Sequence, residues 1–237
     1  MPHTYGVEDN GVILRTRYSD LTRCTEKGVL DVVKEMLFGK ERWHSGVAEF
    51  GSIRHDMFCK ESLETGKLPH CFTDDLDIDW NVTMCEQEMH CTIFPCVELY
   101  STIDAYCPEE HRIIDYKTAS LDPKRIEEEG EKYIKSEYHK HELYYKRSKQ
   151  HLCYALQLMM KGEIAKHASY LVEYWNSDRA DKKSASQLRC LGYQRIDVDF
   201  DMKTLTEFKN GWLRERCERL LVARDVFRKD ANILTNQ

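Results

Sequence analysis

The sequence lacks several features that would identify a class of protein directly. It contains no run of about 18 apolar residues, so we expect no membrane-spanning helix and no membrane partner. It also lacks an excess of basic residues, since 35 Lys and Arg stand against 41 Asp and Glu, for a formal net charge of -6. This balance excludes a protein that coats nucleic acid through charge alone, and any contact with nucleic acid must be local.

The cysteines lack the context of a disulfide framework. The chain has 10 of them, but its first residues show no charged start followed by an apolar run and a cleavage site. We therefore expect a cytoplasmic protein with reduced thiols. A zinc site could draw on Cys85, His90, Cys91, Cys96 and Cys107. The usual C-x₂-C pair is absent there, so ordinary half-buried thiols fit better.

The length of 237 residues and the hydrophobic content of 41% predict one domain over residues 1–237. The sequence shows no internal repeat and no low-complexity tract. Helical spacing predicts helices over 20–38, 47–63, 151–161 and 205–228. The predicted apolar stripe of the second helix consists of Val47, Phe50, Ile53, Met57 and Phe58. Alternating β-branched and aromatic residues predict strands over 82–91, 94–106, 112–118, 168–175 and 189–200. The stretches 73–79 and 176–187 are predicted to be loops. This order predicts an α/β (mixed α+β) fold, in which helices flank a central mixed sheet.

Two acidic residues are predicted to face each other across a hairpin. With residues 108–111 as the turn, antiparallel pairing places Asp104 opposite Asp115, and strand alternation puts Lys117 on the same face as Asp115. Carboxylates this close repel each other, so we expect one of them to have a raised pKa. Paired acids beside an ammonium are what metal-assisted hydrolysis of a phosphodiester bond requires. An exposed hairpin with solvated charges explains the same pattern, and the pattern alone leaves both interpretations open.

The motifs around this hairpin resemble those of RecB-like nucleases in the PD-(D/E)XK superfamily. The stretches 98–104 and 113–118, the second ending in Asp-Tyr-Lys-Thr, are similar to the family's second and third motifs. Gly51 and His55 match its upstream helix, and Gln150 and Tyr154 match its downstream Gln-x-x-x-Tyr helix. The sequence departs from the family at Ile103, where proline is usual. It also has Ser101 where many relatives have glycine.

The resemblance implies a restriction-endonuclease-like core with an antiparallel catalytic hairpin, and a DNA nuclease that depends on Mg²⁺ or Mn²⁺. It implies that Asp104, Asp115 and Lys117 are catalytic. The metal ligands would be Asp104, Asp115, the Tyr116 carbonyl and, as in lambda-type and CRISPR-associated RecB-like exonucleases, His55. Gln150 and Tyr154 would position the DNA or support the site. No iron-sulfur cluster is expected, because only two separated cysteines follow the downstream helix.

An exonuclease or DNA-end-processing enzyme, acting on linear ends or single strands, is the leading interpretation. A restriction-like endonuclease on the same core and a catalytically silent nucleic-acid-binding module remain open, as does a homo-oligomer or a recombination partner protein. The charged, tyrosine-rich segment 124–149 is a candidate DNA-contacting insertion that ends in Lys146, Arg147 and Lys149. A solvated helix whose tyrosines pack on the sheet explains that segment equally well.

Overall fold

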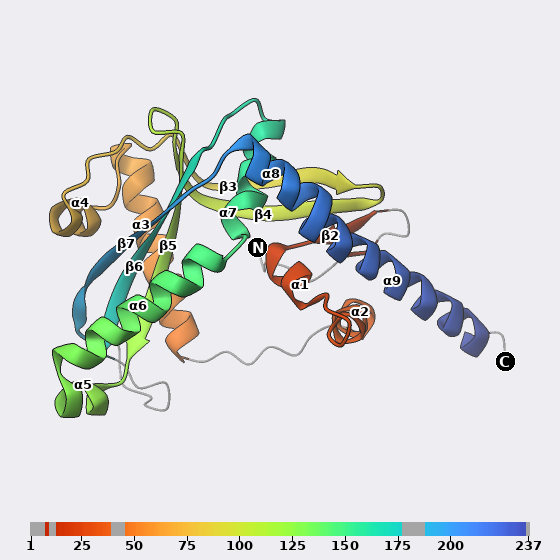
Figure 1. Ribbon diagram of the computed structural model, residues 1–237, viewed down its shortest axis with the longest axis horizontal. Helices are drawn as coiled ribbons and strands as arrows, with labels where there is room; N and C mark the ends of the chain where they lie inside the picture. The colour runs from red at the N-terminus through yellow and green to blue at the C-terminus, as the bar shows by residue number, and fades with distance from the viewer. Residues whose placement is uncertain (1–7, 10–12, 39–45, 177–187, 236–237) are drawn as a thin grey trace.

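The computed structural model describes residues 8–9, 13–38, 46–176 and 188–235. Its centre is a mixed sheet of seven strands with helices packed around it, as the sequence predicted (Figure 1). The order across the sheet is β1-β2-β4-β5-β6-β7, and β3 pairs with β4 outside this path. The strands are β1 (Glu8–Asp9), β2 (Leu14–Thr16), β3 (Met84–Phe94), β4 (Val97–Cys107), β5 (Arg112–Leu121), β6 (His167–Asn176) and β7 (Cys190–Asp199).

The strand β5 lies between one antiparallel and one parallel neighbour. It runs antiparallel to β4, with which it forms the predicted hairpin. On its other side it runs parallel to β6 along its whole length, from Arg112 to Leu121. Parallel neighbours need a long crossover connection, and here the chain between β5 and β6 forms three helices. The last strand, β7, pairs antiparallel with β6.

Two groups of helices cover opposite faces of the sheet. The helices are α1 (Tyr18–Arg23), α2 (Val29–Phe38), α3 (Gly46–Thr65), α4 (His70–Leu76), α5 (Pro123–Glu129), α6 (Glu131–Arg147), α7 (Gln150–Met160), α8 (Met202–Phe208) and α9 (Arg214–Thr235), with a π-helical turn at Lys209–Leu213. On one face, Phe58 of α3 and Phe72 of α4 pack against Tyr116 of β5. On the other face, Tyr133 of α6 packs in one cluster with Tyr170 of β6.

The helix α7 lies on the same face as α6. Its apolar side chains share the largest core cluster with Tyr106 and Ile113 of the hairpin and with residues of α1, α2, α8 and α9. In the view of Figure 1, α9 extends away from the sheet on the side of α1 and α2. No described helix is long and apolar enough to span a bilayer.

Three local predictions were wrong. The single helix predicted over 20–38 is two helices, α1 and α2, separated at residues 24–28. Residues 73–76 of the acidic stretch predicted as a loop belong to α4, because Phe72 is fully buried and ties this helix to the core, whereas residues 77–79 lie outside the helix as predicted. In α3 the predicted stripe is only partly correct, since Ile53 and Met57 are each 52% exposed, whereas Phe58 and Cys59 are buried. The predicted loop over 176–187 lies outside the described residues except for Asn176.

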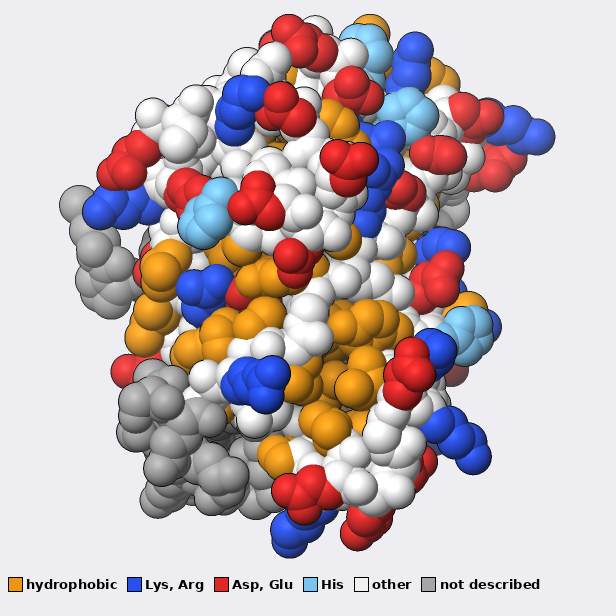
Figure 2. Space-filling model, turned by 90° about the vertical axis from the view of Figure 1, so that its left-hand side faces the viewer, with side chains coloured by type: hydrophobic (Ala, Val, Ile, Leu, Met, Phe, Trp, Pro, Cys, Tyr) orange, Lys and Arg blue, Asp and Glu red, His pale blue; other side chains and the backbone are white. Residues whose placement is uncertain are grey.

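One face of the molecule shows how its charges are distributed. Figure 2 views the side on which α4 and α5 lie in Figure 1, and apolar side chains gather in the middle of this face. Basic and acidic side chains are interspersed around them over the described surface. The described side chains of this face therefore form no continuous basic surface.

Candidate active site

The candidate site lies where β4 and β5 separate. The hairpin pairs Cys107 with Arg112, Tyr106 with Ile113 and Ala105 with Ile114, as predicted. The predicted fourth pair, Asp104 with Asp115, is not part of the ladder. Instead the Tyr116 N–H donates a hydrogen bond of 2.8 Å to Asp104 Oδ2. The carboxylate of Asp104 thus takes the place of a main-chain acceptor at the point where the strands part.

Asp115 and Lys117 of β5 lie next to this carboxylate, two residues apart and therefore on the same face of the strand. Lys117 Nζ is 2.6 Å from Asp115 Oδ2, and the Asp115 side chain is almost fully buried. Asp115 Oδ1 is also buried, and it has no hydrogen-bond partner among the described residues. A buried carboxylate oxygen without a partner is costly. This oxygen is therefore available to a ligand of the site.

The two acids have opposite pKa shifts. Burial raises the pKa of Asp115 to about 7; the ammonium of Lys117 opposes this shift, and the carboxylate of Asp104 adds to it. Burial also acts to raise the pKa of Asp104, but the hydrogen bond from His55 and the charge of Lys117 outweigh it, so that this pKa is lowered. The repulsion expected from the sequence is thus present, and it contributes to the raised pKa of Asp115, whereas the pKa of Asp104 is lowered.

His55 joins the site from α3. Its Nε2 lies 3.0 Å from Asp104 Oδ1. The helix comes this close to β5 because residue 51 is glycine: a Cβ there would lie 2.9 Å from Thr118 Oγ1. A larger residue would require a shift of Thr118 or of α3, which carries His55. The Gly51 and His55 pair of the sequence pattern therefore has a direct structural reason.

A residue that the sequence analysis missed contacts the other ring nitrogen of His55. Glu86 Oε1 lies 3.0 Å from His55 Nδ1. Glu86 belongs to β3 and stands opposite Asp104 in the register set by the Cys85–Ala105 pair. Its φ of +49° lies in the left-handed region, which costs a non-glycine residue roughly 1–3 kcal/mol. Glu86 and Asp104 hold the imidazole ring between them, as carboxylates commonly hold metal-binding histidines.

These contacts set the charge of His55 in the absence of a metal ion. Burial lowers its pKa, but hydrogen bonds with Asp104, Cys59 and Glu86 outweigh burial and raise the pKa well above its ordinary value. The same ring contact lowers the pKa of Glu86. Burial likewise opposes the charge of Lys117, yet Asp115 and Asp104 raise the pKa of this ammonium. Without metal, the site is a compact set of mutually compensating charges.

The predicted supporting pair on α7 lies beside this site. Gln150 Nε2 donates a hydrogen bond of 2.6 Å to the Tyr154 hydroxyl. Burial raises the pKa of Tyr154, and the charges of Asp115 and Asp104 raise it further. The hydroxyl of Tyr154 therefore remains a neutral hydrogen-bonding group close to the two carboxylates.

The tyrosine-rich segment 124–149 shows features of both interpretations, a DNA-contacting insertion and a solvated helix whose tyrosines pack on the sheet. Most of its rings pack on the sheet: Tyr138 stacks on Tyr174 and Tyr145 on Tyr170, at centroid distances of 4.1 and 4.8 Å. Tyr144, by contrast, is 68% exposed.

The basic side chains of the segment are divided in the same way. Lys146 pairs with Glu142 at 2.6 Å, as expected of a solvated helix face. Arg147 and Lys149, at the junction of α6 and α7, form no ion pair within the described part of the chain.

The side chain of Tyr116 lies on the face opposite Asp115. Its hydroxyl is 3.1 Å from Ser62 Oγ of α3, and its ring is buried. Only the main chain of Tyr116 therefore contacts the carboxylates, through the N–H that binds Asp104.

Comparison with known proteins gives structural neighbours only. No protein-family model matches the chain, and no curated protein is significantly similar to it in sequence. The alkaline exonuclease LHK-Exo from Laribacter hongkongensis, solved in complex with dAMP, matches 94% of this chain over 95% of its own, with a TM-score of 0.47 and 12% identity. A phage-related exonuclease from Haemophilus somnus 129PT matches 94% of this chain over 97% of its own length, with a TM-score of 0.49 and 14% identity. At TM-scores below 0.5, the case for a function depends on the side chains of the site.

Proposed function

We propose that this chain is a metal-dependent deoxyribonuclease of the RecB-like branch of the PD-(D/E)XK superfamily, acting as an exonuclease or DNA-end-processing enzyme. The observation that carries the proposal is the pair of buried carboxylates of Asp104 and Asp115 beside the half-buried Lys117, with a carboxylate oxygen that has no hydrogen-bond partner among the described residues. A fold gains nothing from such a group by itself, since buried and incompletely paired charges destabilise it. Perturbed acids of this kind are typical of functional sites.

The residues present fit a hard divalent cation such as Mg²⁺ or Mn²⁺. Asp115 Oδ1 is buried without a described partner, Asp104 lies next to it, and His55 Nε2 is directed at Asp104. Carboxylate oxygens suit Mg²⁺ and Mn²⁺, and an imidazole nitrogen suits the transition metal of the two. We assign Asp104, Asp115, His55 and the Tyr116 carbonyl as the ligands. A bound cation would polarise the scissile phosphate and lower the pKa of a water molecule.

Each remaining group has a role that its contacts support. The ammonium of Lys117, held beside Asp115, would orient a water molecule and offset the negative charge that develops on the phosphate. Glu86 would fix the ring of His55 through Nδ1, leaving Nε2 for the cation. Gln150 and Tyr154 would support the site or contact the strand. We propose Arg147 and Lys149 as phosphate contacts, since neither is neutralised by an acid among the described residues.

A cleavage assay on linear and circular DNA, with Mg²⁺, Mn²⁺ or EDTA, tests this function. We expect degradation of linear DNA that requires the cation and is lost in Asp115→Asn. The matched control is Asp75→Asn, which removes an exposed carboxylate from α4. Cleavage of closed circles would favour a restriction-like endonuclease. Binding of DNA without cleavage under any of these conditions would favour a catalytically silent module.

A further inference from the structure

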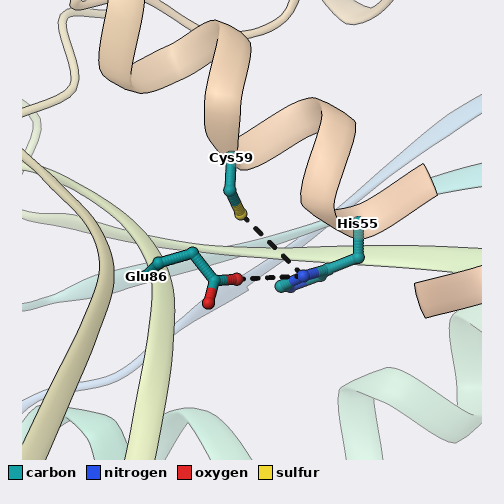
Figure 3. A group of neighbouring side chains, drawn as sticks. All are labelled: His55, Cys59 and Glu86. Atoms are coloured by element: carbon teal, nitrogen blue, oxygen red, sulfur yellow. Dashed lines mark hydrogen bonds and ion pairs between the residues drawn. The ribbon is translucent and has the colours of Figure 1, made fainter. Parts of the chain in front are cut away.

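A second group of potential metal ligands shares His55 with the proposed active site. Figure 3 shows His55 and Cys59, one turn apart on α3, directed toward Glu86 of β3. Cys59 Sγ lies 3.9 Å from His55 Nδ1, and Glu86 Oε1 lies 3.0 Å from the same nitrogen. One ligand atom from each of the three residues lies within 4.8 Å of the other two. None of the five strand cysteine and histidine residues considered from the sequence belongs to this group.

These separations are close to those of a tetrahedral zinc site. With bonds of about 2.3 Å to sulfur and 2.0–2.2 Å to nitrogen and oxygen, tetrahedral ligand atoms lie roughly 3.3–3.6 Å apart. The distances of 3.9 and 3.0 Å to His55 Nδ1 bracket that range, and the sulfur and the Glu86 oxygen lie within 4.8 Å of each other, so a modest inward shift of these side chains would bring the three atoms around one cation. Three protein ligands with water as the fourth is a common zinc arrangement. The side chain of Glu86 is 38% exposed, which gives a cation access to the group.

The chemistry of the ligands separates this group from the proposed catalytic site. A thiolate with an imidazole selects zinc-like cations, whereas paired carboxylates suit Mg²⁺ and Mn²⁺. Cys59 Sγ contacts Nδ1 of the ring and the main-chain carbonyl of Asp104, each at 3.9 Å, whereas the Asp104 carboxylate contacts Nε2. Glu86 is held in this place by a main-chain conformation that few non-glycine residues adopt. Such strain at a position with no role in the core is typical of functional sites.

We propose that His55, Cys59 and Glu86 bind a thiophilic divalent cation, with Zn²⁺ as its representative, and that this binding inhibits the nuclease. The inhibitory part rests on the proposed function. A neutral imidazole has one free lone pair, on either Nδ1 or Nε2. A cation bound at Nδ1 leaves the proton on Nε2, where it is donated to Asp104. His55 then cannot serve the catalytic cation, so the two sites exclude each other at this residue.

Binding is tested on the full chain, independently of any nuclease activity. Asp115→Asn serves as the background, because it weakens the proposed catalytic site and leaves the second group intact. In this background we compare Cys59→Ser with the control Cys85→Ser, which alters a half-buried thiol next to Glu86 but outside the group. Zn²⁺ affinity is measured by competition with a chromogenic chelator, and Co²⁺ reports a thiolate ligand through its charge-transfer absorption.

We expect one tightly bound Zn²⁺ in the background and in the Cys85→Ser control, and at least a tenfold loss of affinity together with loss of the Co²⁺ band in Cys59→Ser. Equal affinity in all three proteins would overturn the site. If thermal melting shows that Cys59→Ser does not fold, Glu86→Gln replaces it, with the same expected loss of affinity and the same overturning result.

Inhibition is tested in Mg²⁺-supported cleavage with increasing Zn²⁺. The cleavage rate of each variant without Zn²⁺ is measured first and serves as that variant's own reference, because Cys59 contacts His55. The Zn²⁺ concentration for half-inhibition should rise at least tenfold in Cys59→Ser and stay unchanged in Cys85→Ser. Equal inhibition of both variants would overturn the inhibitory role. A chain without nuclease activity would refute the proposed function, while the binding measurement would still decide the site.

Discussion

Asp115→Asn should stabilise the metal-free protein, and the gain should grow with pH. In the fold, burial, opposed by Lys117 and reinforced by Asp104, raises the pKa of Asp115 to about 7, compared with 3.8 for a free aspartate. The folded state therefore binds this proton more tightly than the unfolded state. Its contribution to stability is complete below a pH near 3.8 and is lost as the pH rises through about 7. One pKa unit corresponds to 1.36 kcal/mol, so the full loss is at most about 4 kcal/mol.

Asparagine keeps the shape of the side chain and carries no charge, so the variant avoids this loss. Urea unfolding in EDTA at pH 5, 7 and 9 should show Asp115→Asn more stable than wild type by about 1.6 kcal/mol at pH 5 and by up to about 4 kcal/mol at pH 7 and 9. Asp75→Asn serves as the control and should show no such trend. Saturating Mn²⁺ should reduce or reverse the difference, because a cation at a hundred times its Kd adds about 2.7 kcal/mol to the protein that binds it. A difference that does not depend on pH, or a less stable variant at pH 9, would refute the reasoning.

Lys117→Met should lower kcat on linear DNA by roughly 100- to 1000-fold, and it should lower the melting temperature in EDTA at neutral pH because the buried Asp115 loses its ion-pair partner; a wild-type rate would remove Lys117 from the site. Replacing Arg147 and Lys149 by alanine should reduce the slope of log K for DNA binding against log salt concentration by roughly 1 to 2 in magnitude. An unchanged slope would show that both side chains contact only solvent. Burial and then the charge of Lys149 lower the pKa of His151 to about 4. Wild type should therefore lose up to about 3 kcal/mol of stability as the pH falls from 6.5 to 4. His151→Gln should lose less in urea unfolding, and an equal loss would contradict this cause.

The register of the hairpin could be predicted because its determinants are local. Pro108 to His111 form the turn, and three strand pairs follow from its position. Strand alternation then places Lys117 with Asp115. What the turn does not determine is where the ladder stops. That point depends on Asp104 accepting the Tyr116 N–H, a contact between a side chain and the main chain that periodicity does not encode.

Glu86 could not be found in the same way. Its position opposite Asp104 depends on the pairing of β3 with β4, and that pairing is shifted by a bulge between Thr92 and Phe94. A slip of one residue moves every side chain of a strand to the other face. The left-handed φ of Glu86 also breaks the local alternation. A glutamate in a strand of mixed polarity therefore gave no signal that it contacts a histidine about thirty residues earlier in the chain, on another element.

A comparison of two buried acids on neighbouring strands shows why the site requires a functional explanation. Glu173 of β6 is fully buried, yet its oxygens accept hydrogen bonds from Arg54 at 2.6 and 2.9 Å, from Trp175 at 2.7 Å and from Tyr193 at 3.2 Å. That carboxylate is fully satisfied and ties α3 to the sheet.

Asp115 is buried to nearly the same extent, but the Lys117 ammonium on Oδ2 is its one cationic partner among the described residues, Oδ1 has no described hydrogen-bond partner, and the neighbouring Asp104 carboxylate raises its pKa. The same fold can thus satisfy a buried acid fully, as it does Glu173. Because it does not do so for Asp115, and because a second acid lies beside it, the arrangement is better explained by a ligand that both acids bind than by stability of the fold.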